Sequence, residues 1–197
     1  MGIGLDMKIL SVIIIGLFVC SGCSNNPQDP LEPYNRTMYN FNDTVDNVLI
    51  EPVARVYDRI ILEEFQEMIS SFFSNLREPV RFINDVLQLN LNGAATDLKR
   101  FVMNSTFGLF GLMDFADGVA NIPLRNQDYG MTLAKWSNNA QTPFLVLPFL
   151  GPSNVRDTIG FGLTIATNAL IDLDIENYGY IIEGIQKRSD LLKYDSL

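Results

Sequence analysis

Prolines limit the length of every helix that this chain can form between residues 29 and 91. Pro33, Pro52 and Pro79 each stand in or beside a stretch with helical apolar spacing. Proline starts a helix well, but it cannot continue one, because it lacks a backbone N–H and clashes with the preceding turn. We therefore expect short helices that begin near these three positions, and no long uninterrupted helix.

Apolar spacing predicts that most of the chain is helical. Helices are expected at about 29–51, 52–60, 63–76, 79–91, 94–104, 154–170 and 174–192, with a turn at Asn92-Gly93. The stretch at 79–91 is apolar over more of its circumference than a simple core face needs. The predicted fold class is mainly α.

Two apolar segments show no regular period. Residues 106–118 are TFGLFGLMDFADG, and residues 142–153 are TPFLVLPFLGPS, whose three prolines argue against a regular helix or a central strand. Backbone groups of a loop need partners, so an apolar loop must be buried in protein, lie in a membrane or line a partly wet cavity. The sequence leaves these possibilities open, and plain core burial is one of them.

The N-terminus has the pattern of a bacterial lipoprotein signal. The apolar run Ile9–Cys20 is about 12 residues long, whereas a membrane-spanning helix needs roughly 20. Lys8 precedes this run, and Ser21-Gly22 leads into Cys23, which resembles the lipobox. We expect cleavage before Cys23 and lipid attachment at that residue. An ordinary secretory signal with an incidental cysteine is the alternative.

The expected organisation is a signal peptide at 1–22, a lipidated tether at 23–28 and one helical domain at 29–197. Translation is expected to begin at Met7, because Asp6 would spoil a basic leader. Ser24 follows the cysteine, where an aspartate resembles an inner-membrane retention signal. We therefore expect a lipid-anchored protein on the periplasm-facing inner leaflet of the outer membrane.

Composition excludes several classes of function. The chain has no histidine, which removes Ser-His and Cys-His nucleophile pairs, histidine bases and nearly all catalytic zinc sites. Neither G-x-x-x-x-G-K-[ST] nor G-x-G-x-x-G occurs. A net charge of −9 without a basic cluster disfavours nucleic acid. We expect no enzyme, no metal site and no cofactor.

Several motifs resemble the MlaA (VacJ) family of outer-membrane lipoproteins. The opening DPLEPYNRTMYNFN at 29–42 carries much of this resemblance. It continues through EPVA at 51–54, FSNLREP at 73–79, DYGMTL at 128–133 and GPS at 151–153. Two features depart from the family pattern: SNNAQTPF at 137–144 replaces a glycine-rich turn, and the chain stops at Leu197, where members usually continue. We expect a short or truncated member.

The resemblance implies a ring-like bundle of short, proline-broken amphipathic helices lying in one membrane leaflet, with irregular apolar loops and a central amphipathic channel. It implies that misplaced phospholipids leave the outer leaflet through this channel and pass to a periplasmic phospholipid carrier protein. It also implies association with trimeric porins. No energy-coupling motif is present, so transport by this chain alone would be passive.

Candidate residues for the lipid path come mainly from the glycine-rich segment. Phe107, Gly108, Phe110 and Gly111 are candidates because an apolar, glycine-rich loop can approach a channel closely. Arg156 is a further candidate, although an ordinary ion pair with its neighbour Asp157 is the plainer interpretation.

Three arginines are candidate phosphate contacts. Arg77, Arg81 and Arg100 qualify because a guanidinium binds phosphate through a planar fork. Each of them, taken alone, is more often a surface or capping residue.

Two other functions stay open. The chain could be a structural, porin-associated outer-membrane lipoprotein without transport activity. It could also be an anchored phospholipase, although the absence of histidine counts against that class.

Overall fold

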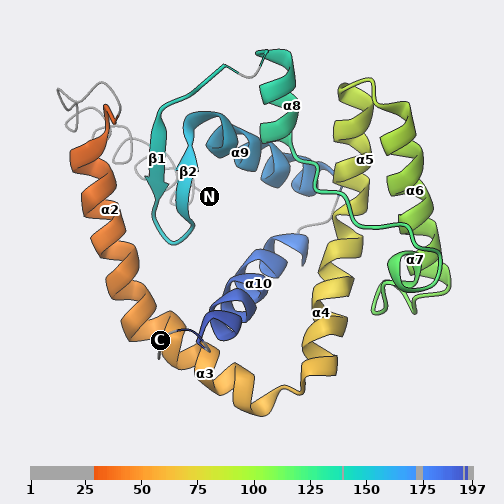
Figure 1. Ribbon diagram of the computed structural model, residues 1–197, viewed down its shortest axis with the longest axis horizontal. Helices are drawn as coiled ribbons and strands as arrows, with labels where there is room; N and C mark the ends of the chain where they lie inside the picture. The colour runs from red at the N-terminus through yellow and green to blue at the C-terminus, as the bar shows by residue number, and fades with distance from the viewer. Residues whose placement is uncertain (1–28, 139, 172–174, 193, 195–197) are drawn as a thin grey trace, which may run out of the picture. The chain divides into compact units, whose positions relative to one another are not determined.

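The structure is a computed structural model, and it describes residues 29–138, 140–171, 175–192 and 194 (Figure 1). The expected signal peptide and the tether with Cys23 lie outside the described residues. The described chain forms two compact units. The first contains residues up to Asp46 together with Gln141–Val155, and the second contains Asn47–Ala140 together with Arg156 onwards.

The first unit is a helix with a β-hairpin. Helix α2 spans Glu32–Val45, and strands β1 (Phe144–Leu147) and β2 (Gly151–Asn154) pair antiparallel. Two asparagines of α2, one at each end of the hairpin contact, bind the backbone of this hairpin. Asn35 accepts from Val146 N–H at 2.8 Å, and Asn42 donates to Leu147 O at 2.9 Å. Side-chain amides therefore hold the hairpin to the helix.

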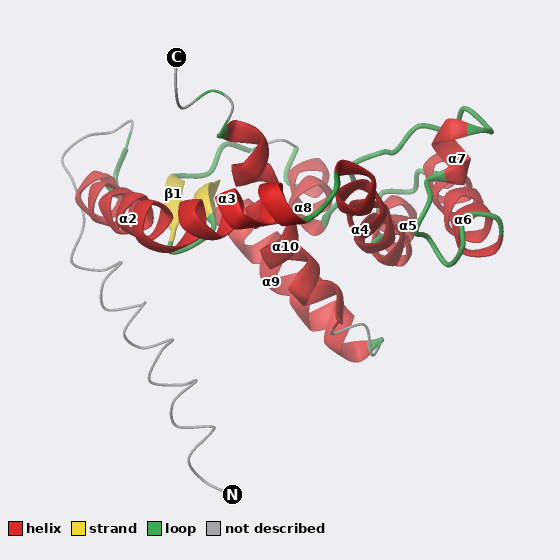
Figure 2. Cartoon of the chain, turned by 90° about the horizontal axis from the view of Figure 1, so that it is seen from below, coloured by secondary structure: helices red, strands yellow, loops and turns green. Residues whose placement is uncertain are grey.

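The second unit is mainly helical. After a π-helical turn at Asp46–Ile50, its elements are α3 (Glu51–Ile60), α4 (Glu63–Leu76), α5 (Glu78–Leu87), α6 (Leu91–Thr106), α7 (Phe115–Gly118), α8 (Tyr129–Trp136), α9 (Val155–Leu170) and α10 (Ile175–Leu191). Figure 2 shows loops after α6 and between α7 and α8. Helix α5 packs on α6, and α10 packs on α3 and α4.

The predicted mainly α class is confirmed, and the helix at 63–76 has the predicted bounds. Prolines stand in the first turn of α2, α3 and α5, as expected. A π-helical turn at Asp46–Ile50 directly precedes Glu51 and Pro52 at the start of α3. Among the described helices, none is both long and apolar enough to cross a bilayer.

Two expectations about local structure are wrong. Asn92-Gly93 is not a turn but lies in the first turn of α6, because Asn90 caps this helix by accepting from Gly93 N–H at 3.2 Å. Residues 142–153 are not irregular throughout, because they contain the hairpin. Pro152 is tolerated there, since both strands of a two-stranded sheet are edge strands. Helix α8 was not predicted.

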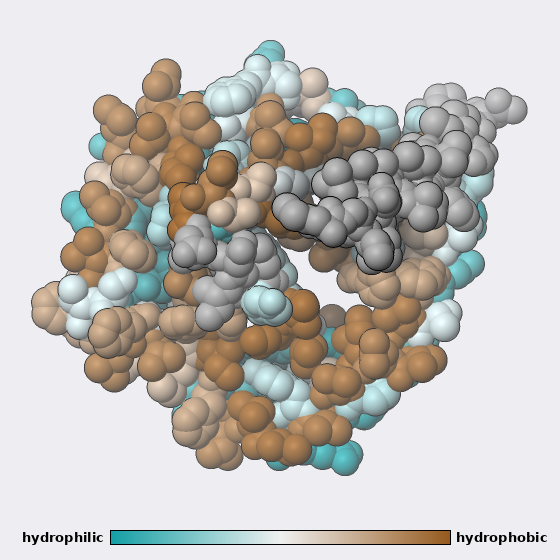
Figure 3. All heavy atoms as spheres, turned by 180° about the vertical axis from the view of Figure 1, so that it is seen from behind, coloured by the Kyte–Doolittle hydropathy of each residue, from teal (hydrophilic) through white to brown (hydrophobic). Residues whose placement is uncertain are grey.

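The interior of the second unit is polar. The largest fully buried side chains of the described chain are all polar or charged: Arg100, Glu78, Asn84, Asn168, Thr132, Asp85, Asp97 and Ser189. Large apolar side chains lie instead on the surface, including several of α3, α6 and α9. Figure 3 shows apolar residues gathered over much of the face that it presents. This distribution is the reverse of the usual one and is typical of a protein whose surroundings are partly hydrocarbon.

Candidate functional site

A buried ionic network joins α5, α6 and the segment after α6. Arg100 Nε donates to Glu78 Oε1 at 2.9 Å, and Arg100 Nη2 donates to Asp114 Oδ2 at 2.7 Å. Arg81 Nη1 lies 3.3 Å from the same Glu78 oxygen. Arg100 also donates to the Ile122 carbonyl. Asp114 and Ile122 both follow α6 in the chain. Their contacts with Arg100 hold this following segment against α6.

The pKa values of these groups show how burial and pairing compete. Burial raises the pKa of Glu78, although Arg81 and Arg100 oppose this shift. Burial also lowers the pKa of Arg81. For Asp114, burial opposes ionisation, but hydrogen bonds from Arg100, the Asp117 N–H and Asn104 outweigh it and lower its pKa. Of the two carboxyl groups in the network, Asp114 is therefore the one whose charged form is stabilised on balance.

A second buried cluster contains two carboxyl groups and one arginine. Arg125 Nη1 donates to Asp85 Oδ2 at 2.8 Å and lies 3.9 Å from Asp97 Oδ1. Burial raises the pKa of Asp97 to about 7, and the hydrogen bond and charge of Asp85 add to that shift. Asp97 is therefore a proton-binding group near neutral pH inside the helical unit.

Two adjoining polar cavities lie in the second unit, with volumes of about 310 Å³ and 360 Å³. Three residues line both of them: Arg77, Arg81 and Asn126. The first cavity is also lined by Asp128, Thr164 and Tyr180, and the second by Ser74, Glu183, Lys187 and Asp190. Two of the three predicted phosphate contacts, Arg77 and Arg81, thus line the same two cavities.

Arg77 is held from α10 on two sides. Its Nη1 lies 2.7 Å from Glu183 Oε1, and its guanidinium carbon lies 4.5 Å from the centre of the Tyr180 ring. Both members of the ion pair keep 17% of their side-chain surface exposed. Limited exposure to water strengthens the attraction between these two charges. Both side chains also line a cavity, so a ligand in that cavity can contact them.

Arg100, the third predicted phosphate contact, lies elsewhere. Its side chain is buried and its guanidinium is bonded to Glu78, Asp114 and the Ile122 carbonyl. It lines neither cavity. The structure thus gives Arg100 the role of organising the interior, apart from the two cavities.

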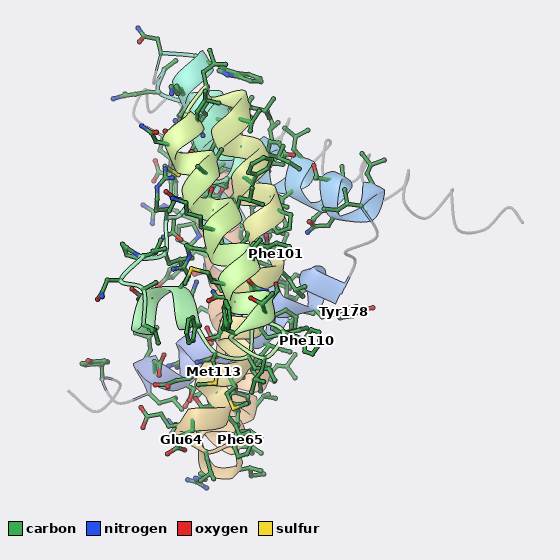
Figure 4. The ribbon with its side chains drawn as sticks, turned by 90° about the vertical axis from the view of Figure 1, so that its right-hand side faces the viewer. Glu64, Phe65, Phe101, Phe110, Met113 and Tyr178 are labelled. Atoms are coloured by element: carbon green, nitrogen blue, oxygen red, sulfur yellow. The ribbon has the colours of Figure 1, made fainter. Side chains whose placement is uncertain are left out.

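The loop after α6 exposes apolar side chains. Phe107 is 64% exposed and Phe110 is 82% exposed, with Leu109 and Met113 also on the surface. Leu109 and Phe110 both have positive φ values, of 52° and 61°, which cost free energy for side chains of this size. Figure 4 shows Phe110 and Met113 of this loop, together with Phe65 of α4, on the side of the unit that faces the viewer. A costly backbone conformation therefore presents apolar groups outward.

The glycines of this loop serve close packing. A Cβ at Gly108 would lie 2.2 Å from the Met113 carbonyl oxygen, and one at Gly111 would lie 2.6 Å from Asn75 Nδ2. Gly111 also has a φ of 91°. Both positions therefore exclude any side chain, and a valine there would disturb the fold before it changed a channel.

Arg156 lies at the start of α9, and its Nε donates to Asp157 Oδ1 at 2.9 Å. It lines neither of the polar cavities that contain Arg77 and Arg81. Four of the five candidates for the lipid path thus lie in the loop after α6. The fifth, Arg156, lies in α9.

Several residues of the site were missed from the sequence. Tyr180 and Glu183 lie on one face of α10 at i and i+3, a spacing that identifies neighbours but not the partner helix. Asp85 and Asp97 are separated by a helix end, so only the packing of α5 on α6 brings them together. Among the described residues, no group of three or more histidine, cysteine or acidic side chains is placed to hold a metal.

Comparison with known proteins gives a consistent result. A family model described as MlaA lipoprotein matches residues 27–197. An uncharacterised protein of Rickettsia conorii is 38% identical over 129 residues, which is 66% of this chain and 51% of the relative. The Escherichia coli K12 protein named intermembrane phospholipid transport system lipoprotein MlaA is 30% identical over 207 residues, which is 97% of this chain and 80% of that protein.

A solved structure described as the structural basis for maintenance of bacterial outer membrane lipid asymmetry is also similar. It superposes with a TM-score of 0.73 at 29% identity, covering 85% of this chain and 86% of that one. The chain spans 51% to 65% of the length of the Rickettsia relatives that it matches.

Proposed function

The chain belongs to the MlaA lipoprotein family, and from this membership we propose that it removes misplaced phospholipids from the outer leaflet of the outer membrane and passes them toward a periplasmic phospholipid carrier protein. The observation that carries the proposal is a unit with pockets lined mainly by polar residues and with large apolar side chains on its surface. Such a unit can keep lipid tails in hydrocarbon while their headgroups move along polar walls.

The free energy of moving a charged headgroup through hydrocarbon explains why this arrangement suits a phospholipid. A charged group in the centre of a bilayer costs at least about 2.5–3.5 kcal/mol, so unassisted movement of a headgroup between leaflets is slow. Cavities lined by Arg77, Arg81 and Asn126 offer charged and hydrogen-bonding partners instead of hydrocarbon. The chain supplies a path in this proposal, and no bond in the lipid is broken.

We propose that the protein is anchored through a lipid on Cys23 and lies in the periplasm-facing leaflet as a ring-like bundle. The exposed apolar side chains of α3, α6 and α9 support this placement, because each would be costly in water. Phe107 and Phe110, with the backbone of Gly108 and Gly111, would then border hydrocarbon at the lipid path. Trimeric porins are the proposed membrane partners.

A structural, porin-associated role without transport is the second candidate. The exposed apolar helix faces would also suit a protein partner, but that role gives no reason for polar cavities of several hundred Å³. Transport accounts for both features.

The test is a strain that lacks its own family member and carries this chain as the only copy. Outer-leaflet phospholipid, measured by chemical labelling of intact cells, should fall to the normal level. Asn126→Trp, which fills both cavities from an exposed position, should restore the excess phospholipid, whereas Asn92→Trp on the exposed face of α6 should not. Normal lipid asymmetry with Asn126→Trp at normal protein level would favour the structural role.

A further inference from the structure

We propose that the Arg77–Glu183 ion pair recognises a zwitterionic headgroup, in which a phosphate and a primary amine sit together. The proposal rests on the proposed transport of phospholipids and names the headgroup that the site favours. Its basis is the position of this pair at the junction of two polar cavities, where an arriving headgroup must meet it.

The position of Arg77 makes it the first element of this site. Arg77, Arg81 and Asn126 are shared by both cavities, so these side chains form the boundary between them. Glu183 lines one cavity, and Tyr180 lines the other. A headgroup that passes from one cavity to the other therefore passes the ion pair.

The two contacts of Arg77 differ in a way that permits exchange. The Tyr180 ring contacts the face of the guanidinium at 4.5 Å, and that contact does not involve the edge of the fork. The Glu183 carboxylate binds the edge at 2.7 Å, where a phosphate would also bind. A phosphate can thus replace Glu183 while Tyr180 keeps the guanidinium in its plane.

Displacement of Glu183 leaves a carboxylate that needs a cation. Uncompensated charge in a partly buried site is costly, and Glu183 is only 17% exposed. An ammonium on the same headgroup supplies the missing partner. One protein ion pair is then replaced by two contacts to one ligand, and the reverse exchange releases the headgroup again.

The charge of the surrounding wall favours a headgroup without net charge. Among the residues that line the two cavities, three are cations and three are anions: Arg77, Arg81, Lys187, Asp128, Glu183 and Asp190. Arg81 is also neutralised by buried Glu78, which lies 3.3 Å away outside the lining. The site therefore has no surplus of positive charge with which to hold a net-anionic headgroup such as phosphoglycerol.

The experiment uses the full-length acylated protein in nanodiscs of equal phosphatidylethanolamine and phosphatidylglycerol, with mass spectrometry of the lipid retained after purification. The unaltered protein should enrich phosphatidylethanolamine. Glu183→Gln removes the partner of the amine and should lower this enrichment on the order of tenfold, the size of one charge-assisted hydrogen bond. Arg77→Met should lower retention of both lipids. Arg36→Gln, which removes an exposed arginine from a surface pair, should change neither.

A second measurement needs no variant and so does not depend on their folding. Soluble phosphoethanolamine should displace retained lipid from the unaltered protein at lower concentration than glycerol phosphate does. Equal displacement, or equal retention of the two lipids, would overturn the inference and leave the transport proposal standing. Failure of the unaltered protein to retain any phospholipid would overturn the transport proposal itself.

Discussion

Replacing Asp97 by asparagine should remove much of the pH dependence of this protein's stability between pH 5 and pH 8. Asp97 is fully buried and faces Asp85, Arg125 and Glu78. The folded chain keeps the Asp97 proton until about pH 7, because burial raises this pKa from 3.8. Unfolded chains release it near pH 4, so the folded state binds more protons in between. The free energy of unfolding therefore falls as pH rises through this window.

The magnitude follows from the size of the shift. A pKa raised from 3.8 to about 7, at 1.36 kcal/mol per unit, lowers the free energy of unfolding by about 2.5 kcal/mol between pH 5 and pH 8. For a chain of this length, that corresponds to about 5–10 °C in the melting temperature. Asparagine stays neutral and can still hydrogen-bond Asp85, so the variant should lack this loss and be the more stable protein at pH 8.

The assay is thermal unfolding of the acylated protein in a nonionic detergent, followed by circular dichroism at pH values from 5 to 8. Asp117→Asn is the matched control, because it makes the same chemical change at an exposed position. Parallel curves of melting temperature against pH for Asp97→Asn and the unaltered protein would refute the reasoning. A loss of stability in Asp97→Asn that grows as the pH rises would refute it too, since it would mean that the carboxylate itself stabilises the fold.

Three further changes test other parts of the structure. Arg100→Met should lower the free energy of unfolding in urea by about 3–5 kcal/mol, because it leaves a buried carboxylate of α5 without its main partner; a loss under about 1 kcal/mol would contradict this. Gly111→Ala should lower the free energy of unfolding by about 1–3 kcal/mol, since φ is 91° and the new Cβ would lie 2.6 Å from Asn75 of α4. Gly118→Ala is the control and should be tolerated, because the new Cβ would have nothing within 4 Å. Phe110→Asp should weaken flotation of the unacylated chain with neutral vesicles about tenfold and leave its melting temperature unchanged, because this side chain is 82% exposed; a large drop in melting temperature would show that the ring packs within the fold.

The sequence predicted the features that depend on local chemistry. Prolines at the starts of helices and apolar spacing in 63–76 gave elements that the structure confirms, and the motifs gave a family resemblance that the comparisons confirm. The hairpin escaped prediction because its strands are held by Asn35 and Asn42 of a helix more than 100 residues away. No pattern within 142–153 contains that information.

The candidate site was predicted only in part for a similar reason. Arg77 and Arg81 lie four residues apart and share a cavity, as their common role suggested. Arg100 has the same chemistry, but its position on the α5-facing side of α6 places it beside Glu78, where its charge serves the interior. Residue type identified possible phosphate ligands, but only packing could decide which of them reaches a cavity.

The polar interior also changes which substitutions the protein should tolerate. A hydrocarbon core accepts exchanges among residues of similar volume, because dispersion contacts have little direction. Here Asn84, Thr132 and Asp85 are buried through directional hydrogen bonds, so even an isosteric replacement removes a defined donor or acceptor. The exposed apolar positions meet no such requirement, and apolar residues should replace one another there freely. Saturation mutagenesis should therefore find the strictest positions among hydrophilic residues and the most permissive among large hydrophobic ones.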